Sequence, residues 1–384
     1  MNVVTVVSVN MLSNKEIKTL FIISDLERGG PEMRLLDFAR HFPVDLKVFI
    51  CVTSEQVGLL KEFQQYDTSI IIVPIKRAYL EISKLLSICR YVKENRISVI
   101  NSFELKGLLV ALFVKCYGNP GLRVVHHAVD LLHSFSVRQK CVLWLLLQLV
   151  DAVICNSKQA KEIIKNKYLP EAKIRVIYNG VDTGLFTRTD YVQGEQLRIK
   201  YGVNKNEIII GTVANFRKEK NYPFLIDGFK RLLERYPALR LLCVGGGTYL
   251  DDIKRNVNEN GLSGKAIFTG YTQDVASHIA IMDVFVLCSL KESFPNALIQ
   301  AMSMEVPVVA SSVGGCREIV ENGENGLLFE PNDRAEFINA VSRLIEDKEL
   351  AGTCIRNAKT KVDRHFSLHR MIESYRDFYR SFKQ

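Results

Sequence analysis

Short apolar runs alternate with longer amphipathic stretches from residue 18 onward, and this alternation restricts the fold more than any other feature. Seven such runs lie in the first half, at residues 20–24, 46–52, 70–73, 99–100, 123–125, 152–155 and 175–177. Stretches with helical spacing lie between most of them. Strands that alternate with helices in this way predict a parallel sheet with helices on both faces.

The alternation stops between residues 184 and 206, where the sequence is polar and has no long apolar face. It resumes with strand-like runs at residues 208–213, 241–244, 266–269, 284–288 and 306–311. The length of 384 residues also favours two domains, because single cores stop growing at about 250–300 residues. We therefore predict two Rossmann-like, doubly wound α/β domains, at residues 1–186 and 187–365, facing each other across a cleft. Ligands are expected in this cleft, at the carboxyl ends of the strands.

Residues 366–384 form a further helical segment with an unusual amount of aromatic surface. Met371, Tyr375, Phe378 and Tyr379 fall on one face of this helix. Such a face must pack on something, either its own domain or the first domain. We expect the helix to cross back to the first domain.

The net charge and the cysteines restrict the possible partners and the cellular compartment of the protein. The net charge is +9, and the first 184 residues hold 24 Lys or Arg against 17 Asp or Glu. A basic half suits nucleic acid, a membrane surface or a phosphorylated acceptor, although scattered solvated lysines give the same total. The nine cysteines form no CxxC pair and no cluster with metal-ligand spacing, which favours a reducing, cytoplasmic compartment and no metal site. No signal peptide is evident, and the longest apolar stretch, residues 141–150, is too short to span a bilayer. It is expected to form a buried helix or a surface-associated one.

Glu292 lies between a strand-like run and a predicted helix that begins at Pro295. The amino end of a helix offers unpaired N–H groups to an anion, and Ser293 and Phe294 belong to the same turn. A carboxylate beside an anion site suits a ligand in which a sugar with free hydroxyls is attached to a phosphate. The alternative is that Glu292 only complements the helix dipole.

Arg217 and Lys220 lie in a basic loop after the first strand of the second domain. Cations at such a place stabilise the negative charge that develops on a departing diphosphate. Arg217 can bind two phosphate oxygens, whereas Lys220 acts as a point charge. The alternative is a solvated basic loop.

Two features of the predicted first domain also suggest ligand binding. Gly29 and Gly30 stand between a strand and a helix, where backbone can approach a ligand closely, but the dinucleotide pattern GxGxxG is absent. His126 and His127 directly follow a strand-like run, with His133 nearby. They are interpreted either as groups that bind a hydroxyl or act as a base, or as structural histidines. A zinc site is not expected, because neighbouring strand residues point to opposite faces.

Taken together, these segments resemble the retaining glycosyltransferases of family four, which have the GT-B architecture. The resemblance covers essentially the whole chain from residue 18 and rests on motifs in the order and spacing of the family. These motifs lie at residues 29–32 (GGPE), 151–157 (DAVICNS), 173–182 (KIRVIYNGVD), 292–302 (ESFPNALIQAM), 306–320 (VPVVASSVGGCREIV) and 325–329 (NGLLF).

The resemblance implies that the second domain binds a nucleotide sugar and the first domain an acceptor. It implies that the diphosphate is held by two cations and a helix end, that Glu292 positions the transferred sugar, and that Tyr271 lies near the base. The residues implied in substrate binding are Gly29, Gly30, Arg217, Lys220, Tyr271, Ser293, Phe294, Pro295 and Gln300. Those implied in catalysis are Glu292, His127 and His126. No metal or other cofactor is implied, and the sequence has no DxD triplet.

Four positions depart from the family pattern. The second Glu of the Glu-x7-Glu pair is Gln300, which still accepts hydrogen bonds but loses a charge, at a cost of roughly 1 kcal/mol in donor binding. The usual Gly-Arg pair is Ala-Asn at residues 214–215, so Arg217 would have to substitute for the missing arginine. Glu305 replaces a helix-ending Gly, and Ser293 stands where Gly is frequent.

The sequence thus predicts transfer of a hexose or N-acetylhexosamine, with retention, from a UDP-sugar to a glycan or lipid-linked acceptor in cell-surface polysaccharide synthesis. The expected partners are this donor, this acceptor and a peripheral contact with the inner face of the membrane, without nucleic acid. Two alternatives stay open. One is a degenerate, non-catalytic member that binds nucleotide, and the other is a nucleotide-sugar epimerase on the same fold.

Overall fold

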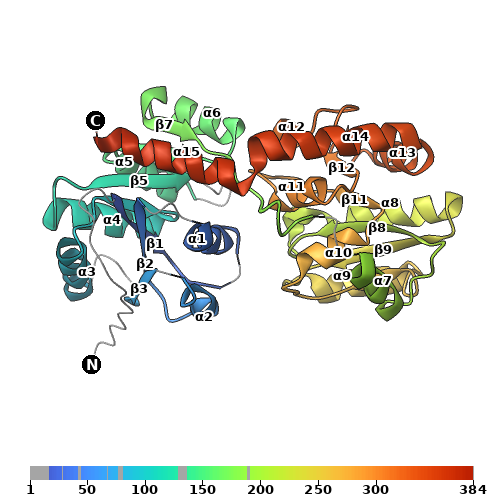
Figure 1. Cartoon of the computed structure of the whole chain (residues 1–384), viewed down its shortest axis with the longest axis horizontal. Coiled ribbons are helices and arrows are strands. Elements are labelled where there is room, and N and C mark those ends of the chain that lie inside the picture. The colour runs from blue at the N-terminus through green and yellow to red at the C-terminus, as the bar shows by residue number, and fades with distance from the viewer. Residues whose placement is uncertain are drawn as a thin grey trace. The chain divides into compact units, whose positions relative to one another are not determined.

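The computed structural model describes residues 17–383 except residues 28, 42–44, 67, 77–80, 129–135 and 188–190. The chain forms two compact units, the first made of Met1–Tyr178 with His369–Gln384 and the second of Asn179–Leu368 (Figure 1). Each unit has its own parallel sheet and its own apolar core. The expected fold class, two doubly wound α/β sheets, is confirmed.

The first unit contains seven parallel strands in the order β3-β2-β1-β4-β5-β6-β7. The strands are β1 (Ile17–Ile23), β2 (Leu46–Val52), β3 (Ser69–Ile72), β4 (Val99–Ser102), β5 (Arg123–Ala128), β6 (Ala152–Cys155) and β7 (Ile174–Val176). The helices are α1 (Gly30–His41), α2 (Leu60–Phe63), α3 (Ile82–Glu94), α4 (Leu105–Tyr117), α5 (Val137–Gln148), α6 (Lys158–Lys167) and α15 (Leu368–Arg380). The strand order reverses between β1 and β4, which makes this pair the switch point of the sheet.

The C-terminal helix α15 lies along the first unit (Figure 1), and its aromatic face is buried. Tyr375 packs edge-on against Phe38 of α1, with ring centroids 4.7 Å apart. Tyr379 donates a hydrogen bond from its hydroxyl to Asn101 Oδ1 in β4, at 2.9 Å. The aromatic residues of α15, near the end of the chain, therefore pack among residues of the first unit, which come from the beginning of the chain.

The second unit contains six parallel strands in the order β10-β9-β8-β11-β12-β13. The strands are β8 (Ile208–Val213), β9 (Leu239–Val244), β10 (Ala266–Phe268), β11 (Val284–Leu287), β12 (Val308–Ser311) and β13 (Leu327–Phe329). The helices are α7 (Tyr191–Lys200), α8 (Tyr222–Arg235), α9 (Leu250–Glu259), α10 (Val275–Ala280), α11 (Asn296–Ser303), α12 (Cys316–Ile319), α13 (Arg334–Glu346) and α14 (Lys348–Lys361). Here the order reverses between β8 and β11.

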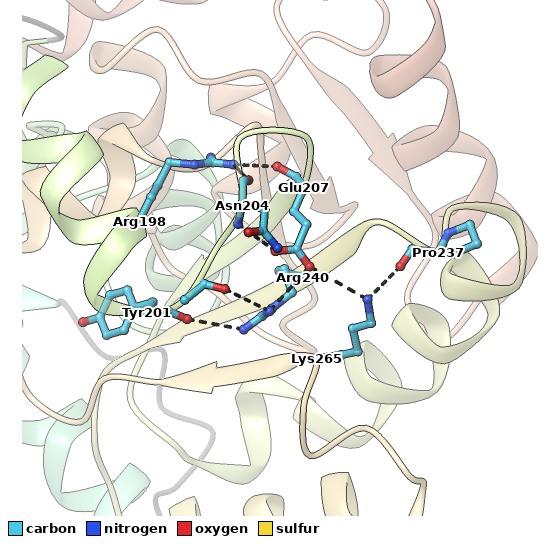
Figure 2. A network of polar contacts seen from close by, with 8 residues as sticks. Arg198, Tyr201, Asn204, Glu207, Pro237, Arg240 and Lys265 are labelled. Carbon is cyan, nitrogen blue, oxygen red and sulfur yellow. Dashed lines mark hydrogen bonds and ion pairs between the residues drawn. The ribbon is translucent and has the colours of Figure 1, made fainter.

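A network of hydrogen bonds and ion pairs around Glu207 links residues at the amino ends of the strands of the second sheet (Figure 2). Arg198 donates to the Glu207 carbonyl at 2.6 Å, and the Glu207 carboxylate lies 3.5 Å from Arg240 and 3.9 Å from Lys265. Burial alone would raise the pKa of Glu207, but the Asn204 N–H and the charge of Arg240 outweigh it and lower that pKa. This network lies at the amino ends of the strands, at the opposite edge from the carboxyl ends where a doubly wound sheet binds ligands.

The two units divide after Tyr178, whereas the sequence places the boundary near residue 186. The intervening segment packs on the second unit, since Asn179 Nδ2 donates to Asn296 Oδ1 at 2.7 Å and Ser303 Oγ donates to the Phe186 carbonyl at 2.7 Å. The functions given to residues 1–186, 187–365 and 366–384 stay predictions. Across the described part of the chain, every helix is too short or too polar to cross a bilayer.

Candidate active site

The carboxyl ends of β8 and β11 are the place where a doubly wound sheet of this order binds a ligand, because the strand order reverses there. Residues 214–221 follow β8, and residues 288–295 follow β11. The two loops touch, with the Leu290 N–H donating to the Glu219 carbonyl at 2.8 Å. Two of the sequence-predicted site residues are carried by the first loop and four by the second.

Lys220 and Glu292 meet between these loops as an ion pair. Lys220 Nζ donates to Glu292 Oε1 at 2.6 Å, and Ser289 Oγ donates to the same oxygen at 2.6 Å. The lysine side chain is 25% exposed and the glutamate side chain 10%. Charges that are partly withdrawn from water interact more strongly than charges in bulk solvent. The pair therefore holds a cation for an anionic ligand directly beside a carboxylate that can accept hydrogen bonds from hydroxyls.

Arg217 stands on the same loop, at the start of the short helical turn of Lys218–Lys220. Its carbonyl accepts a hydrogen bond from the Lys220 N–H at 3.1 Å, so the two residues belong to one turn. The Arg217 side chain is exposed to solvent. The loop after β8 thus places one half-buried cation, Lys220, and two exposed cations, Arg217 and Lys218, at this edge of the sheet.

Glycines allow the neighbouring loops to approach this edge closely. Gly245 and Gly247, which follow β9, have φ of +134° and +143°, values that residues with side chains rarely adopt. A Cβ atom on either glycine would collide with a backbone oxygen of the loop after β8. Tyr271 packs over Gly246, and the residue stays 67% exposed. The aromatic face of Tyr271 therefore remains accessible beside the glycine loop.

The turn before α11 differs slightly from its expected form. Pro295 caps the helix with φ −78° and ψ 105° rather than forming its first turn, so α11 begins one residue later. Phe294 is buried and packs against Phe366, with ring centroids 5.4 Å apart. Gln300 lies one turn into α11 and is half-buried.

Gly315 fixes the backbone of this turn from the loop after β12. Its N–H donates to the Glu292 carbonyl at 3.3 Å, and a Cβ atom at Gly315 would collide with the Ser293 carbonyl. The positions of Glu292 and Ser293 therefore depend on a glycine in the next loop. Sequence reasoning placed Gly315 in a family motif without assigning it this role.

In the first unit, Gly29 and Gly30 lie where β1 leads into α1. A Cβ atom on Gly30 would meet nothing within 4 Å, whereas one on Gly29 would collide with the Glu32 carboxylate. Glu32 is buried, and this burial, together with the charges of Asp25 and Glu104, raises its pKa to about 7 although its own backbone N–H opposes the shift. The first turn of α1 therefore contains a carboxyl group whose pKa lies near neutral pH.

His126 and His127 lie inside β5, not after it as expected, and both are buried. His126 Nδ1 is 3.0 Å from Ser102 Oγ. His127 Nε2 is 3.0 Å from Asn101 Oδ1, and its Nδ1 is 3.4 Å from the Tyr375 hydroxyl. The third histidine of the sequence analysis lies outside the described residues.

These surroundings keep both imidazoles neutral. Burial lowers the pKa of His126 to about 4. Burial, with the charges of Arg34 and His126, lowers the pKa of His127 well below its ordinary value. Such contacts favour the structural alternative for the two histidines, and the catalytic role assigned to them stays a prediction without support from this geometry.

Sequence reasoning assigned no role to Ser289 or to the charge of Glu32. Ser289 is the first polar residue after β11 and stands three positions before Glu292, a spacing that could have indicated the hydrogen bond. The raised pKa of Glu32 depends on residues distant in sequence, so no local pattern signals it. Among the described residues, no group of three or more His, Cys, Asp or Glu side chains is arranged to hold a metal ion.

Comparisons with known proteins identify the family of the chain. A family model described as Glycosyltransferase Family 4 matches residues 28–185, and one described as Glycosyl transferases group 1 matches residues 193–361. The chain is 28% identical over 311 residues to UDP-Gal:alpha-D-GlcNAc-diphosphoundecaprenol alpha-1,3-galactosyltransferase of Escherichia coli, covering 78% of this chain and 79% of that protein. It is 24% identical over 379 residues to the capsular polysaccharide biosynthesis glycosyltransferase CapM of Staphylococcus aureus, covering 94% and 97%.

Solved structures share the fold. HepE of Anabaena, crystallised in complex with UDP-glucose, superposes with a TM-score of 0.86 at 23% identity, over 95% of this chain and all of that one. WaaG, a glycosyltransferase involved in lipopolysaccharide biosynthesis, superposes with a TM-score of 0.71 at 15% identity, over 94% and 99%. At these identities the likeness establishes the fold alone.

Proposed function

The chain belongs to glycosyltransferase family four, and from this premise we propose that it moves a sugar from a UDP-sugar to a glycan or lipid-linked acceptor in cell-surface polysaccharide synthesis. The transferred sugar is a hexose or an N-acetylhexosamine. The observation that carries this proposal is the Lys220–Glu292 pair at the switch point of the second sheet. It combines a phosphate-binding cation with a hydroxyl-binding carboxylate, the two functions that a nucleotide sugar requires.

In this proposal Lys220 and Arg217 hold the diphosphate, and N–H groups of the turn at Ser293 and Phe294 add to its binding. The acceptor oxygen attacks the anomeric carbon from the face that the diphosphate leaves, so the configuration is retained. The bond from the sugar to the phosphate oxygen breaks, and the acceptor proton passes to the departing diphosphate. The cations stabilise the charge that develops there more in the transition state than in the ground state. Glu292 binds sugar hydroxyls and is not assigned as a nucleophile.

The first unit binds the acceptor in this proposal, with the open position of Gly30 facing the ligand. The named acceptor of the Escherichia coli relative, a diphosphoundecaprenol-linked sugar, supports a lipid-linked acceptor here. Such an acceptor lies in a bilayer, so the protein would work in the cytoplasm at the inner face of a membrane. The basic first half of the chain suits this setting.

The test is a transfer assay in which UDP-, GDP- and ADP-sugars are offered with a short lipid diphosphate sugar as the acceptor. The proposal predicts UDP release and a product larger by one sugar, with the UDP forms alone raising the melting temperature in parallel scans. Isomerised donor without transfer would identify an epimerase. Binding of UDP without any release would identify a non-catalytic member, an outcome that the departures at Gln300 and Asn215 keep open.

A further inference from the structure

Helix α5 of the first unit exposes apolar side chains on most of its circumference. Only Leu143 and Leu147 are buried in the core, with Leu146 packed beside them. The outward residues are large and well exposed, from 41% for Val142 to 76% for Val137. They are Val137, Val142, Trp144, Leu145 and Leu149. A helix with apolar side chains on most of its sides is normally covered, and none of the residues that the structure describes covers this face.

The helix is nevertheless well formed at its beginning. Ser136 and Gln139 make a reciprocal capping box, in which the Gln139 N–H donates to Ser136 Oγ at 3.3 Å and the Ser136 N–H donates to Gln139 Oε1 at 2.9 Å. Val142, Leu145 and Leu149 then fall at i, i+3 and i+7, which places them in one stripe. The exposed apolar face is therefore a fixed surface of a regular helix.

The surface continues onto the neighbouring helices. α3 packs beside α4, and α4 beside α5, on one face of the sheet. Of the thirteen large apolar side chains that are exposed among the described residues, nine belong to these helices or their ends, whereas the second unit contributes four scattered ones. The nine, which we call the apolar patch, are Ile82, Leu86, Leu109, Tyr117, Val137, Val142, Trp144, Leu145 and Leu149.

The charge on the same three helices selects the kind of partner. α3, α4 and α5 together carry seven basic residues and one acidic residue, Glu94. A second copy of this chain, related by a two-fold axis, would bring these like charges together. An anionic lipid surface would neutralise them and bury the apolar side chains. Trp and Tyr, represented here by Trp144 and Tyr117, are the side chains that settle at the boundary between lipid and water.

We propose that the apolar patch docks this protein onto an anionic phospholipid bilayer, with α5 lying in the interface and Trp144 inserted into it. This inference deepens the proposed use of a lipid-linked acceptor but does not depend on the reaction, because it rests on exposure and charge alone. Docking by this face keeps the first unit, the proposed acceptor unit, at the surface where a lipid-linked sugar is held.

The chain offers a direct reporter, since Trp144 is its one tryptophan. Phosphatidylcholine vesicles that contain phosphatidylglycerol should shift Trp144 emission to the blue and should sediment the protein, whereas pure phosphatidylcholine vesicles should do so far less. Replacing Arg138 by Gln should weaken partitioning about five-fold, the equivalent of about 1 kcal/mol for one basic residue at an anionic surface. Raising the salt concentration should weaken it further.

The decisive variant is Leu145→Glu with Leu149→Glu, which should abolish both signals. Ile199→Glu is the matched control, because Ile199 on α7 is equally apolar and 76% exposed but lies in the second unit. If the glutamate variant proves unstable, Leu145→Ser with Leu149→Ser replaces it. The control should bind vesicles as the unaltered protein does.

Three results would overturn the proposal. The first is that vesicles cause no change in the emission of Trp144. The second is that the double variant still binds vesicles. The third is that, without lipid, the emission of Trp144 shifts as the protein concentration rises and sedimentation shows a dimer. The last result would assign the patch to a second copy of the chain. UDP release with a soluble acceptor, measured on the same variants, separates this inference from the proposed function, because the patch variants should retain it.

Discussion

At the scale of single residues, the proposed site for a phosphate and a sugar rests on the ion pair of Lys220 and Glu292. Each side chain is held by the other, and Ser289 fixes the shared carboxylate oxygen. These contacts within the protein orient both charged groups. Preorganised charge of this kind is usually the largest single contribution to catalysis.

Glu292→Gln tests the role of the carboxylate. The amide keeps the shape and one acceptor oxygen but leaves Lys220 Nζ without an anionic partner. We expect kcat for sugar transfer to fall by about 10²-fold, the usual loss when one charged group of a preorganised site is removed. Steady-state rates of UDP release measure this. Glu259→Gln, an exposed change at the end of α9, is the control, and equal kcat for both variants would refute the assignment.

The raised pKa of Glu32 leads us to expect that the free energy of unfolding depends on pH. Because its folded-state pKa is about 7, above the ordinary 4.5, the folded protein binds more protons between these values and loses stability as pH rises through them. Glu32→Gln should therefore stabilise the protein by about 1 kcal/mol more at about pH 8 than at about pH 5, a figure reduced from the full linkage value for solvent screening. Urea unfolding at both pH values measures the difference. Glu55→Gln, an exposed change, should show none, and a pH-independent effect of Glu32→Gln would contradict the raised pKa.

At the scale of elements, the end of α11 carries a strained residue. Glu305 has φ +57°, a left-handed conformation that costs a residue with a side chain roughly 1–2 kcal/mol. Glu305→Gly should remove this strain and, after the extra entropy of glycine in the unfolded chain, raise the free energy of unfolding by about 0.5–1 kcal/mol. Thermal unfolding measures the change. The control is Asp347→Gly, which should lower the free energy of unfolding, because Asp347 caps α14 with φ −93°. A lower melting temperature for Glu305→Gly would contradict strain at Glu305.

Helix α15 is expected to contribute to stability through two tyrosines. Tyr379→Phe removes only the hydroxyl that donates to Asn101, and should cost about 1 kcal/mol. Tyr379→Ala also opens a cavity in a fully buried site, and should cost about 3–5 kcal/mol. Tyr117→Phe, at an exposed ring, is the control. Urea unfolding of the three variants checks the order, and an Ala variant as stable as the Phe variant would show that α15 is not docked as described.

The elements themselves could be predicted well from the sequence because their signals are local. Apolar runs located the seven strands of the first sheet and five of the six strands of the second, but they missed β13 at its edge. The positive φ of Glu305 was indicated by the glycine expected there. The errors arose where distant contacts decide. β5 extends through His126 and His127 because β6 pairs with it there. Residues 179–187 join the second unit through contacts with α11.

The charged residues of the candidate site could be predicted from the sequence. The contacts that hold these residues in place could not. Lys220 and Glu292 are 72 positions apart, and only the strand order brings their loops together. The contact of Gly315 with Ser293 and the approach of Gly245 to the loop after β8 depend on the same strand order. The burial of His127 also depends on α15, whose Tyr375 lies against its ring although it comes from the other end of the sequence.

At the scale of the whole molecule, two sheets of the same construction carry different chemistry at their switch points. The second presents cations beside a carboxylate, and the first presents a loop with an open glycine and a carboxyl group that titrates near neutrality. The first unit also carries the apolar patch and its basic residues. This division suits a protein that takes a water-soluble anionic donor and an acceptor held at a lipid surface.

The most direct test of the central claim is the affinity for UDP, measured by titration calorimetry, of the unaltered protein, Lys220→Met and Lys254→Met. Methionine keeps the length of the side chain without its charge, and Lys254 is an exposed lysine of α9 in the same unit. Loss of a charge-assisted contact worth about 1.5–3 kcal/mol should raise the Kd of Lys220→Met about ten- to a hundred-fold and leave that of Lys254→Met unchanged. Equal affinities in all three proteins would contradict the account.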